Sequence, residues 1–147
     1  IRAILLTHGH FDHVGAVKAL AQKAACPVWI HEQELKLPPY LTFGALYYTD
    51  LYSDVGSILN VEGLRFRILE TPGHTMGSVC LLCGEVLFSG DTLFAGSCGR
   101  TDLGGNTSMI LESLKRLAAL PGDYTVCPGH GGETTLNYER RYNPYLR

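Results

Sequence analysis

The feature that most limits what this chain can fold into is a pattern that occurs four times. Each time, a strand-like run ends, a glycine follows, and a histidine or aspartate comes next. The four segments are THGHFDH at 7–13, TPGH at 71–74, SGD at 89–91 and CPGH at 127–130. Glycine lets the backbone turn sharply where a strand ends. Because strand ends at one edge of a sheet assembly meet in one crevice, the pattern predicts an α/β arrangement with one shared polar site.

The hydrophobic pattern between these segments predicts alternating strands and helices. Pro27 is expected to end the first helix, and Asn106 or Thr107 to cap the second. Residues 38–54 are long for a plain connection, so they are expected to form a lid or binding wall, or else an aromatic packing or subunit contact. Strands are expected at 2–6, 28–31, 64–71, 79–83, 85–89 and 124–127, and helices at 14–25 and 106–120.

Length and charge exclude several classes of protein. We expect residues 1–147 to form one domain, since the chain shows no repeat or linker. The 12 basic and 14 acidic residues give no positive field, so nucleic acid is not an expected partner. No apolar run reaches the roughly 20 residues of a membrane span, and no signal peptide is visible. The chain is therefore expected to be cytoplasmic and not associated with a membrane.

The five cysteines indicate reduced thiols in a cytoplasm rather than a disulfide framework, because the count is odd and the spacing is not dense. Cys80 and Cys83 form a C-x-x-C motif. They lie in a strand-like stretch, however, where positions three apart face opposite ways. A redox or zinc pair is therefore not expected there.

Seven side chains in these four segments can bind metal: His8, His10, Asp12, His13, His74, Asp91 and His130. Seven nitrogen and oxygen ligands are too many for one tetrahedral ion, which takes three protein ligands and a water molecule at a catalytic site. Two ions that share one carboxylate fit this number. The expected sets are His8, His10 and His74 for the first ion and Asp12, His13 and His130 for the second, with Asp91 as the bridge.

Each of these residues also has a purely structural interpretation. Asp12 could cap the following helix, and Asp91 could form an Asx-turn. His74 and His130 could be turn histidines bonded to backbone carbonyls. The joint occurrence of all seven argues against these readings. His31 has no glycine turn before it and is expected to be structural.

The ligand pattern, H-x-H-x-D-H followed by single His, Asp and His residues, resembles that of the metallo-β-lactamase superfamily. Within it, LFAGSCGRTDL at 93–103 and GHGGETTLNYERRYNPYL at 129–146 resemble the glyoxalase II group, in particular its short bacterial hydroxyacylglutathione hydrolases. The resemblance implies an α+β fold of four layers, α/β/β/α, with two mixed sheets face to face and a dimetal site at one edge. Asp91 stands where the β-lactam hydrolases characteristically have cysteine, so antibiotic hydrolysis is not expected.

The same resemblance implies hydrolysis of a thioester such as S-lactoylglutathione by a hydroxide held between two divalent ions. Zinc is the expected metal, with iron and manganese as alternatives. Asp12 or Asp91 is expected to orient the nucleophile as well as bind metal. Arg100 occupies the loop where the group places a basic glutathione contact, although it could instead pair with Asp102.

Two other functions fit the same residues. Persulfide dioxygenases share the fold and a similar CGRTD loop, and use one iron at the positions of His8, His74 and Asp91. A non-catalytic fold retained for binding is the third candidate. Metal content separates the three.

The chain departs from the family pattern at both ends. Full-length family members that act on glutathione thioesters carry a further helical domain, whereas this chain ends 17 residues after His130. The family fold opens with several strands before its first ligand, which here is residue 8. The apolar run RAILL at 2–6 is typical of an interior strand with neighbours on both sides. We therefore expect N-terminal residues of the protein to precede Ile1.

Overall fold

The computed structural model of this chain describes residues 1–53 and 56–147. The predicted loop 38–54 thus ends at a residue, Asp54, that lies outside the described part. The helices are α1 Phe11–Val14, α2 Val17–Ala24, a 3₁₀ helix Glu32–Lys36, α3 Pro39–Thr42, α4 Thr107–Ala118 and α5 Leu136–Tyr142. The strands are β1 Ile4–Leu5, β2 Val28–Ile30, β3 Asp50–Leu51, β4 Ile58–Val61, β5 Leu64–Glu70, β6 Val79–Cys83, β7 Val86–Gly90, β8 Leu93–Phe94, β9 Ser97–Cys98, β10 Thr125–Pro128 and β11 Thr134–Thr135.

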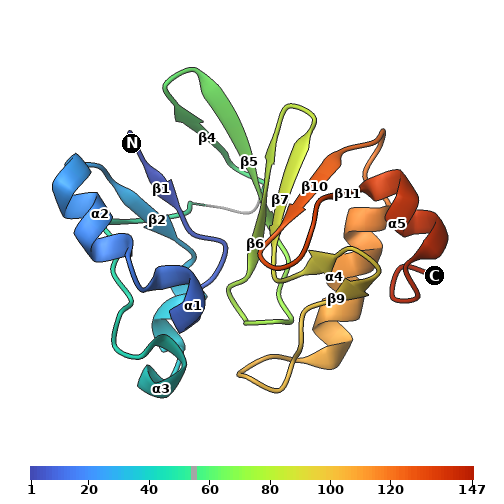
Figure 1. Ribbon diagram of the computed structural model, residues 1–147, viewed down its shortest axis with the longest axis horizontal. Helices are drawn as coiled ribbons and strands as arrows, with labels where there is room; N and C mark the ends of the chain where they lie inside the picture. The colour runs from blue at the N-terminus through green and yellow to red at the C-terminus, as the bar shows by residue number, and fades with distance from the viewer. Residues whose placement is uncertain (54–55) are drawn as a thin grey trace.

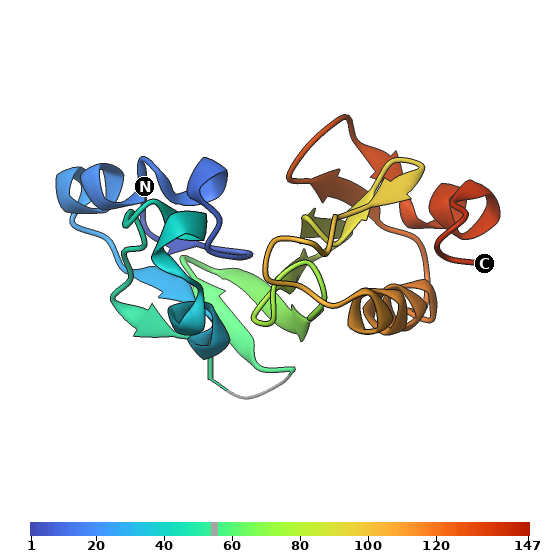
Figure 2. The ribbon, with the colours of Figure 1, turned by 90° about the horizontal axis from the view of Figure 1, so that it is seen from below.

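Two main sheets stand between outer helices (Figures 1 and 2). One has the order β1-β2-β3, and the other has the order β11-β10-β7-β6-β5-β4. The six-stranded sheet is mixed, since β7 and β10 are parallel while its other pairs are antiparallel. The three-stranded sheet is parallel in both of its described pairings, so the expectation of two mixed sheets is wrong for these strands.

Strand β1 lies at the edge of the three-stranded sheet. It pairs with β2, and its other side has no strand partner among residues 1–53 and 56–147. Ile4 and Leu5 are accordingly half-buried. Two neighbours were expected for this apolar run, and the described residues supply one of them.

Three apolar clusters fill the spaces between the layers. One strand can contribute to two clusters, because successive residues of a strand point to opposite faces. Val28 and Ile30 of β2 pack toward α2, whereas Trp29 between them joins the cluster that lies between the sheets. In β6, Val79 joins that same cluster, and Cys80 faces the helices α4 and α5. Burial on both faces explains why these strands are apolar throughout. The layers confirm the predicted α/β/β/α sandwich.

Local structure differs from the prediction where the sequence signal is weak. The helix expected at 14–25 is two helices, α1 and α2, and the break falls at Gly15 and Ala16, where glycine has low helix propensity. Helix α4 begins after Asn106, whose side chain accepts a hydrogen bond from the Met109 N–H as expected of a cap. The two-residue strands β3, β8, β9 and β11 were not predicted, because two residues carry no periodicity. Strand β4, the 3₁₀ helix, α3 and α5 were also missed. Across the part of the chain that the structure describes, no helix combines the length and apolar character needed to cross a membrane.

Candidate metal centre

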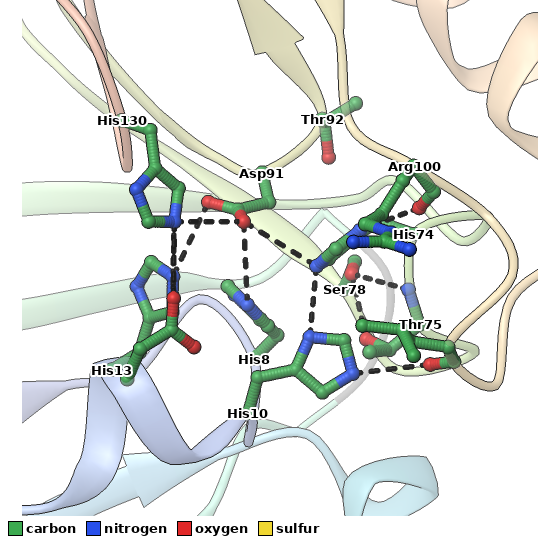
Figure 3. Close-up of polar contacts among 12 residues, drawn as sticks. His8, His10, His13, His74, Thr75, Ser78, Asp91, Thr92, Arg100 and His130 are labelled. Carbon is green, nitrogen blue, oxygen red and sulfur yellow. Dashed lines mark hydrogen bonds and ion pairs between the residues drawn. The ribbon is translucent and has the colours of Figure 1, made fainter. Parts of the chain in front are cut away.

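The ligand candidates meet because several strands end at the same edge. Strands β5, β7 and β10 run in the same direction within the large sheet, as their pairings require. The loops that follow them carry His74, Asp91 and His130. Segment 7–13 approaches from the other sheet and completes the cluster (Figure 3). The structure thus brings together all seven side chains that the sequence singled out.

The first group consists of His8, His10 and His74, and all three side chains are buried. One nitrogen from each ring lies within 4.8 Å of the others. His10 Nδ1 and His74 Nε2 are only 2.9 Å apart. These three residues are those expected around the first ion.

Outer contacts determine which nitrogen of two of these rings carries the proton. His74 Nδ1 donates to the Arg100 carbonyl at 2.7 Å, and His10 Nε2 donates to the Leu103 carbonyl at 3.1 Å, since a carbonyl can only accept. In the neutral rings the opposite nitrogens, His74 Nε2 and His10 Nδ1, then present lone pairs to each other. Two facing lone pairs repel, and a cation between them removes the repulsion. Such outer hydrogen bonds are typical of metal-binding histidines.

The second group consists of Asp12, His13 and His130 and is more exposed. Asp12 Oδ2 lies 3.2 Å from His130 Nε2 and 3.5 Å from His13 Nε2. The two Nε2 atoms are 3.2 Å apart. The side chain of His130 is 54% exposed, whereas that of His74 is 4% exposed. This group therefore lies at the mouth of the site.

Asp91 reaches both groups. Its Oδ2 lies 3.4 Å from His74 Nε2 and 3.3 Å from His130 Nε2, and its Oδ1 lies 3.4 Å from His13 Nε2. Asp91 Oδ1 and His8 Nε2 are buried polar atoms that make no hydrogen bond within the described residues. Buried polar atoms without partners are rare, and here they point into a cluster of nitrogen and oxygen donors. The donor set therefore fits two cations that share the Asp91 carboxylate.

The protonation equilibria of the two groups differ. Burial, reinforced by the neighbouring His13, holds the pKa of His8 well below its usual value, and burial also lowers the pKa of His74. Burial opposes protonation of His13 too, but the Asp91 and Asp12 carboxylates outweigh it and raise the pKa of His13. Burial alone would raise the pKa of Asp91, yet the surrounding histidines lower it. The lowered pKa values favour the neutral rings of His8 and His74 and the ionised carboxylate of Asp91, which are the forms that bind metal.

Two glycines of the repeated pattern are required for close packing. Gly73 has a φ of 146°, and a Cβ there would lie 2.3 Å from the Ile110 Cα of α4. A Cβ on Gly129 would lie 2.2 Å from Asp91 Oδ1. The glycines thus let α4 and the bridging carboxylate approach the ligand loops.

A cleft of about 440 Å³ opens over the cluster of candidate ligands. Its apolar lining includes Phe11, Leu41, Phe94 and Leu103. Phe43 stacks on Phe11 with ring centroids 4.2 Å apart. Leu41 and Phe43 belong to the predicted loop 38–54, which therefore supplies part of the cleft wall as well as an aromatic contact.

Arg100 also lines the cleft, and its guanidinium group is paired with Asp102. Nε donates to Oδ1 at 2.6 Å and Nη2 donates to Oδ2 at 2.5 Å. The pair lowers the pKa of Asp102 to about 2. Of the two expectations for Arg100, the carboxylate pair is present, and a role in substrate binding stays a prediction.

A purely structural interpretation was available for several other residues, and it fails at Asp12. His31 is outside the cluster: its Nδ1 accepts from the Gln33 N–H, and its Nε2 lies 3.0 Å from Glu70 Oε1. Cys80 and Cys83 are both free thiols. The helix-cap alternative for Asp12 is wrong, because Asp12 lies within α1 and its carboxylate faces His13 and His130.

One residue near the centre escaped the sequence prediction. Glu34, in the 3₁₀ helix, is fully buried and accepts hydrogen bonds from the backbone N–H groups of Gly9 and Gly77. No local signal in HEQELKL distinguishes this glutamate from its neighbours. Its partners lie 25 and 43 residues away, so only the folded chain reveals the contact.

Comparison with known proteins agrees with the ligand pattern. Residues 1–130 match the family model described as the metallo-beta-lactamase superfamily. The hydroxyacylglutathione hydrolase GloC of Haemophilus influenzae is 36% identical over 161 residues, covering 99% of this chain and 76% of that protein. The crystal structure of BLEG-1 B3 metallo-beta-lactamase has a TM-score of 0.89 and 38% identity, covering 99% of this chain and 77% of that one. The structure of TTHA1623 in a di-iron-bound form has a TM-score of 0.86 and 40% identity, covering 98% and 77% respectively.

Proposed function

The chain belongs to the metallo-β-lactamase superfamily, and we propose that within this superfamily of metallo-hydrolases it is a thioester hydrolase that uses two divalent cations. The observation that carries the proposal is the pairing of two ligand groups through one carboxylate, that of Asp91. Two cations held at such sites would supply a nucleophile at neutral pH, because they would lower the pKa of a bound water molecule to about 7.

The protein residues then have separable roles. Asp91 holds the two halves of the cluster together, and Asp12 lies at the cleft, where its carboxylate can accept a hydrogen bond from the attacking water. Phe11, Leu41 and Phe94 exclude water from the acyl side of the substrate. A thiolate is a good leaving group, so the reaction needs no strong general acid. These roles suit a thioester better than an amide, whose leaving group must be protonated.

Glutathione is the proposed thiol. The GloC relative, described as a hydroxyacylglutathione hydrolase, supports S-lactoylglutathione as the first substrate to assay. Arg100 lies at the cleft and carries the positive charge that a glutathione carboxylate requires. Since Asp102 already pairs with Arg100, the substrate carboxylate must share or displace that partner.

The second candidate is the persulfide dioxygenase reaction, with a single iron held by His8, His74 and Asp91. The observation that favours it is the contrast in burial between the two groups, since the first is buried and the second is partly exposed. A protein that retained metal only in the first group would match this alternative. We propose zinc as the metal of the hydrolase. Iron is the alternative, because the structure of TTHA1623 is described in a di-iron-bound form.

The deciding experiment measures metal content per chain and activity on the same purified protein. Two ions per chain, with release of free thiol from S-lactoylglutathione, are the expected result. One iron per chain, with oxygen consumption on glutathione persulfide, would replace the hydrolase by the dioxygenase. A β-lactam belongs in the assay because a 38% identical structure is described as a B3 metallo-beta-lactamase. A protein that binds no metal and turns over none of these substrates would favour the non-catalytic binding function.

A further inference from the structure

We propose that Glu34 is a positioning residue that ties together the two ligand segments of the first histidine group. The inference rests on the proposed metal-binding role of His8, His10 and His74, and it adds a residue that is not itself a ligand. It concerns how the fold keeps three rings in place before a cation binds.

The contacts of Glu34 are specific to the two segments. Its Oε2 accepts the N–H of Gly9 at 2.7 Å, and Gly9 is the residue between His8 and His10. Its Oε1 accepts the N–H of Gly77 at 2.8 Å, three residues after His74. One carboxylate therefore connects segment 7–13, which follows β1 of the small sheet, to segment 71–78, which follows β5 of the large sheet.

The two peptide groups pack directly against the carboxylate. A Cβ added to Gly77 would lie 2.7 Å from Glu34 Oε1, and one added to Gly9 would lie 3.3 Å from Oε2. Glu34 is 0% exposed, so both hydrogen bonds are shielded from bulk water. If the carboxylate were lost, two backbone N–H groups would be left without partners, and both segments would have to move.

Glutamate is the side chain that this geometry requires. Glutamine keeps the length but offers one acceptor oxygen, and its amide group would direct N–H bonds at one of the two backbone N–H groups. Backbone anchoring by Glu34 complements the ring contacts already described, in which the carbonyls of Leu103 and Arg100 orient His10 and His74. Together they fix both the position and the rotation of the first histidine group.

The chain offers a matched control in Glu139 of α5. This carboxylate is also 0% exposed, and it accepts from the Gly96 N–H at 2.8 Å, the Asn143 amide at 2.8 Å and the Thr134 hydroxyl at 2.7 Å. None of these partners belongs to segments 7–13 or 71–78. Glu139→Gln therefore makes the same chemical change at an equally buried carboxylate whose partners lie outside the two segments of the first histidine group.

The experiment titrates Co²⁺ into the metal-free full chain and into the Glu34→Gln and Glu139→Gln variants, followed by visible absorption and calorimetry. Each titration is repeated with His130→Ala added, so that the first group is measured without an intact second group. We expect Glu34→Gln to weaken Co²⁺ binding at the first group by about 10-fold to 100-fold, the usual effect of removing outer contacts. Glu139→Gln should leave this affinity within about twofold, even where thermal unfolding shows an equal loss of stability. Gly77→Ala, which crowds Glu34 without removing it, is the second variant if Glu34→Gln does not fold, and it should weaken the same site.

Equal affinities for the Glu34 and Glu139 variants would overturn the positioning role, as would an unchanged affinity in both Glu34→Gln and Gly77→Ala. The proposed hydrolase activity fails by a different result. A wild-type chain that binds Co²⁺ at both groups but cleaves no thioester would refute the activity and leave the Glu34 comparison intact.

Discussion

The cluster of candidate ligands has two halves, the first group (His8, His10 and His74) and the second group (Asp12, His13 and His130). The two halves contain similar side chains in different surroundings. His10 and His74 each donate their outer ring N–H to a backbone carbonyl, and a buried carboxylate holds the backbone around them. Asp12 and His130 are 39% and 54% exposed. In the part of the chain that the structure describes, neither outer ring nitrogen of His13 or His130 makes a hydrogen bond comparable to those of the first group.

This difference shows that the fold prepares one metal position more fully than the other. Buried rings that already donate a hydrogen bond to a backbone carbonyl lose little conformational entropy when a cation binds, so ordering them costs little binding free energy. Exposed rings must be ordered at that moment, and water competes for the cation. We therefore expect the first group to bind more tightly than the second. Each prediction below tests this asymmetry, in order of expected effect.

The largest effect should come from the residue that the two halves share. Asp91→Asn removes the negative charge that both groups face, so both ions should bind more weakly and thioester turnover should fall by orders of magnitude. Metal content by mass spectrometry and kcat measured on the same sample test this. Circular dichroism checks that the variant still folds. A turnover within tenfold of wild type would mean that Asp91 does not join the two halves.

Removing one histidine from each half should give unequal losses of stability. His74→Ala removes a buried ring and leaves the Arg100 carbonyl without its donor, so the metal-free protein should lose about 1–3 kcal/mol of unfolding free energy. His130→Ala, at a largely exposed side chain, should change it by at most about 0.5 kcal/mol. Urea denaturation of both metal-free variants provides the comparison. Equal losses would show that burial does not distinguish the halves.

Lowering the pH should release the cation of the second group before the cation of the first group. The pKa of His13 is raised and those of His8 and His74 are lowered, so His13 takes up a proton at a higher pH than the other two as the pH falls. A protonated ring cannot bind a cation. Lowering the pH stepwise from about 7.5 should therefore release one ion per chain before the second, as counted by native mass spectrometry. Release of both ions in a single step would contradict the asymmetry.

The smallest effect on catalysis is expected from Arg100, a cleft residue that belongs to neither group of ligands. Arg100→Ala removes a cleft side chain that contributes to binding in the ground state and the transition state alike, so KM for S-lactoylglutathione should rise severalfold with kcat nearly unchanged. Asp102→Ala, which frees the same guanidinium group, is the matched control and should not raise KM. A large fall in kcat with constant KM would place Arg100 in the chemistry rather than in binding.

Much of the centre was predictable because its ligands follow a local rule. His74, Asp91 and His130 each come directly after a glycine at the end of a strand, and strand direction then brings them to one edge. The break in the first helix and the two-residue strands were not predictable, since they depend on packing rather than on periodicity.

The amino-acid sequence by itself determined the set of seven candidate ligands, because the spacing of glycines and ligands is a local property of the chain. The layered fold was implied by the resemblance of this ligand pattern to that of a known family. Only the tertiary structure decided how the ligands are supported. Glu34 reaches Gly9 and Gly77 across 25 and 43 residues, and the Leu103 carbonyl meets His10 across 93. Burial is likewise a property of the assembled layers, so the contrast between a buried and an exposed half of one cluster could not be read from residues of the same types.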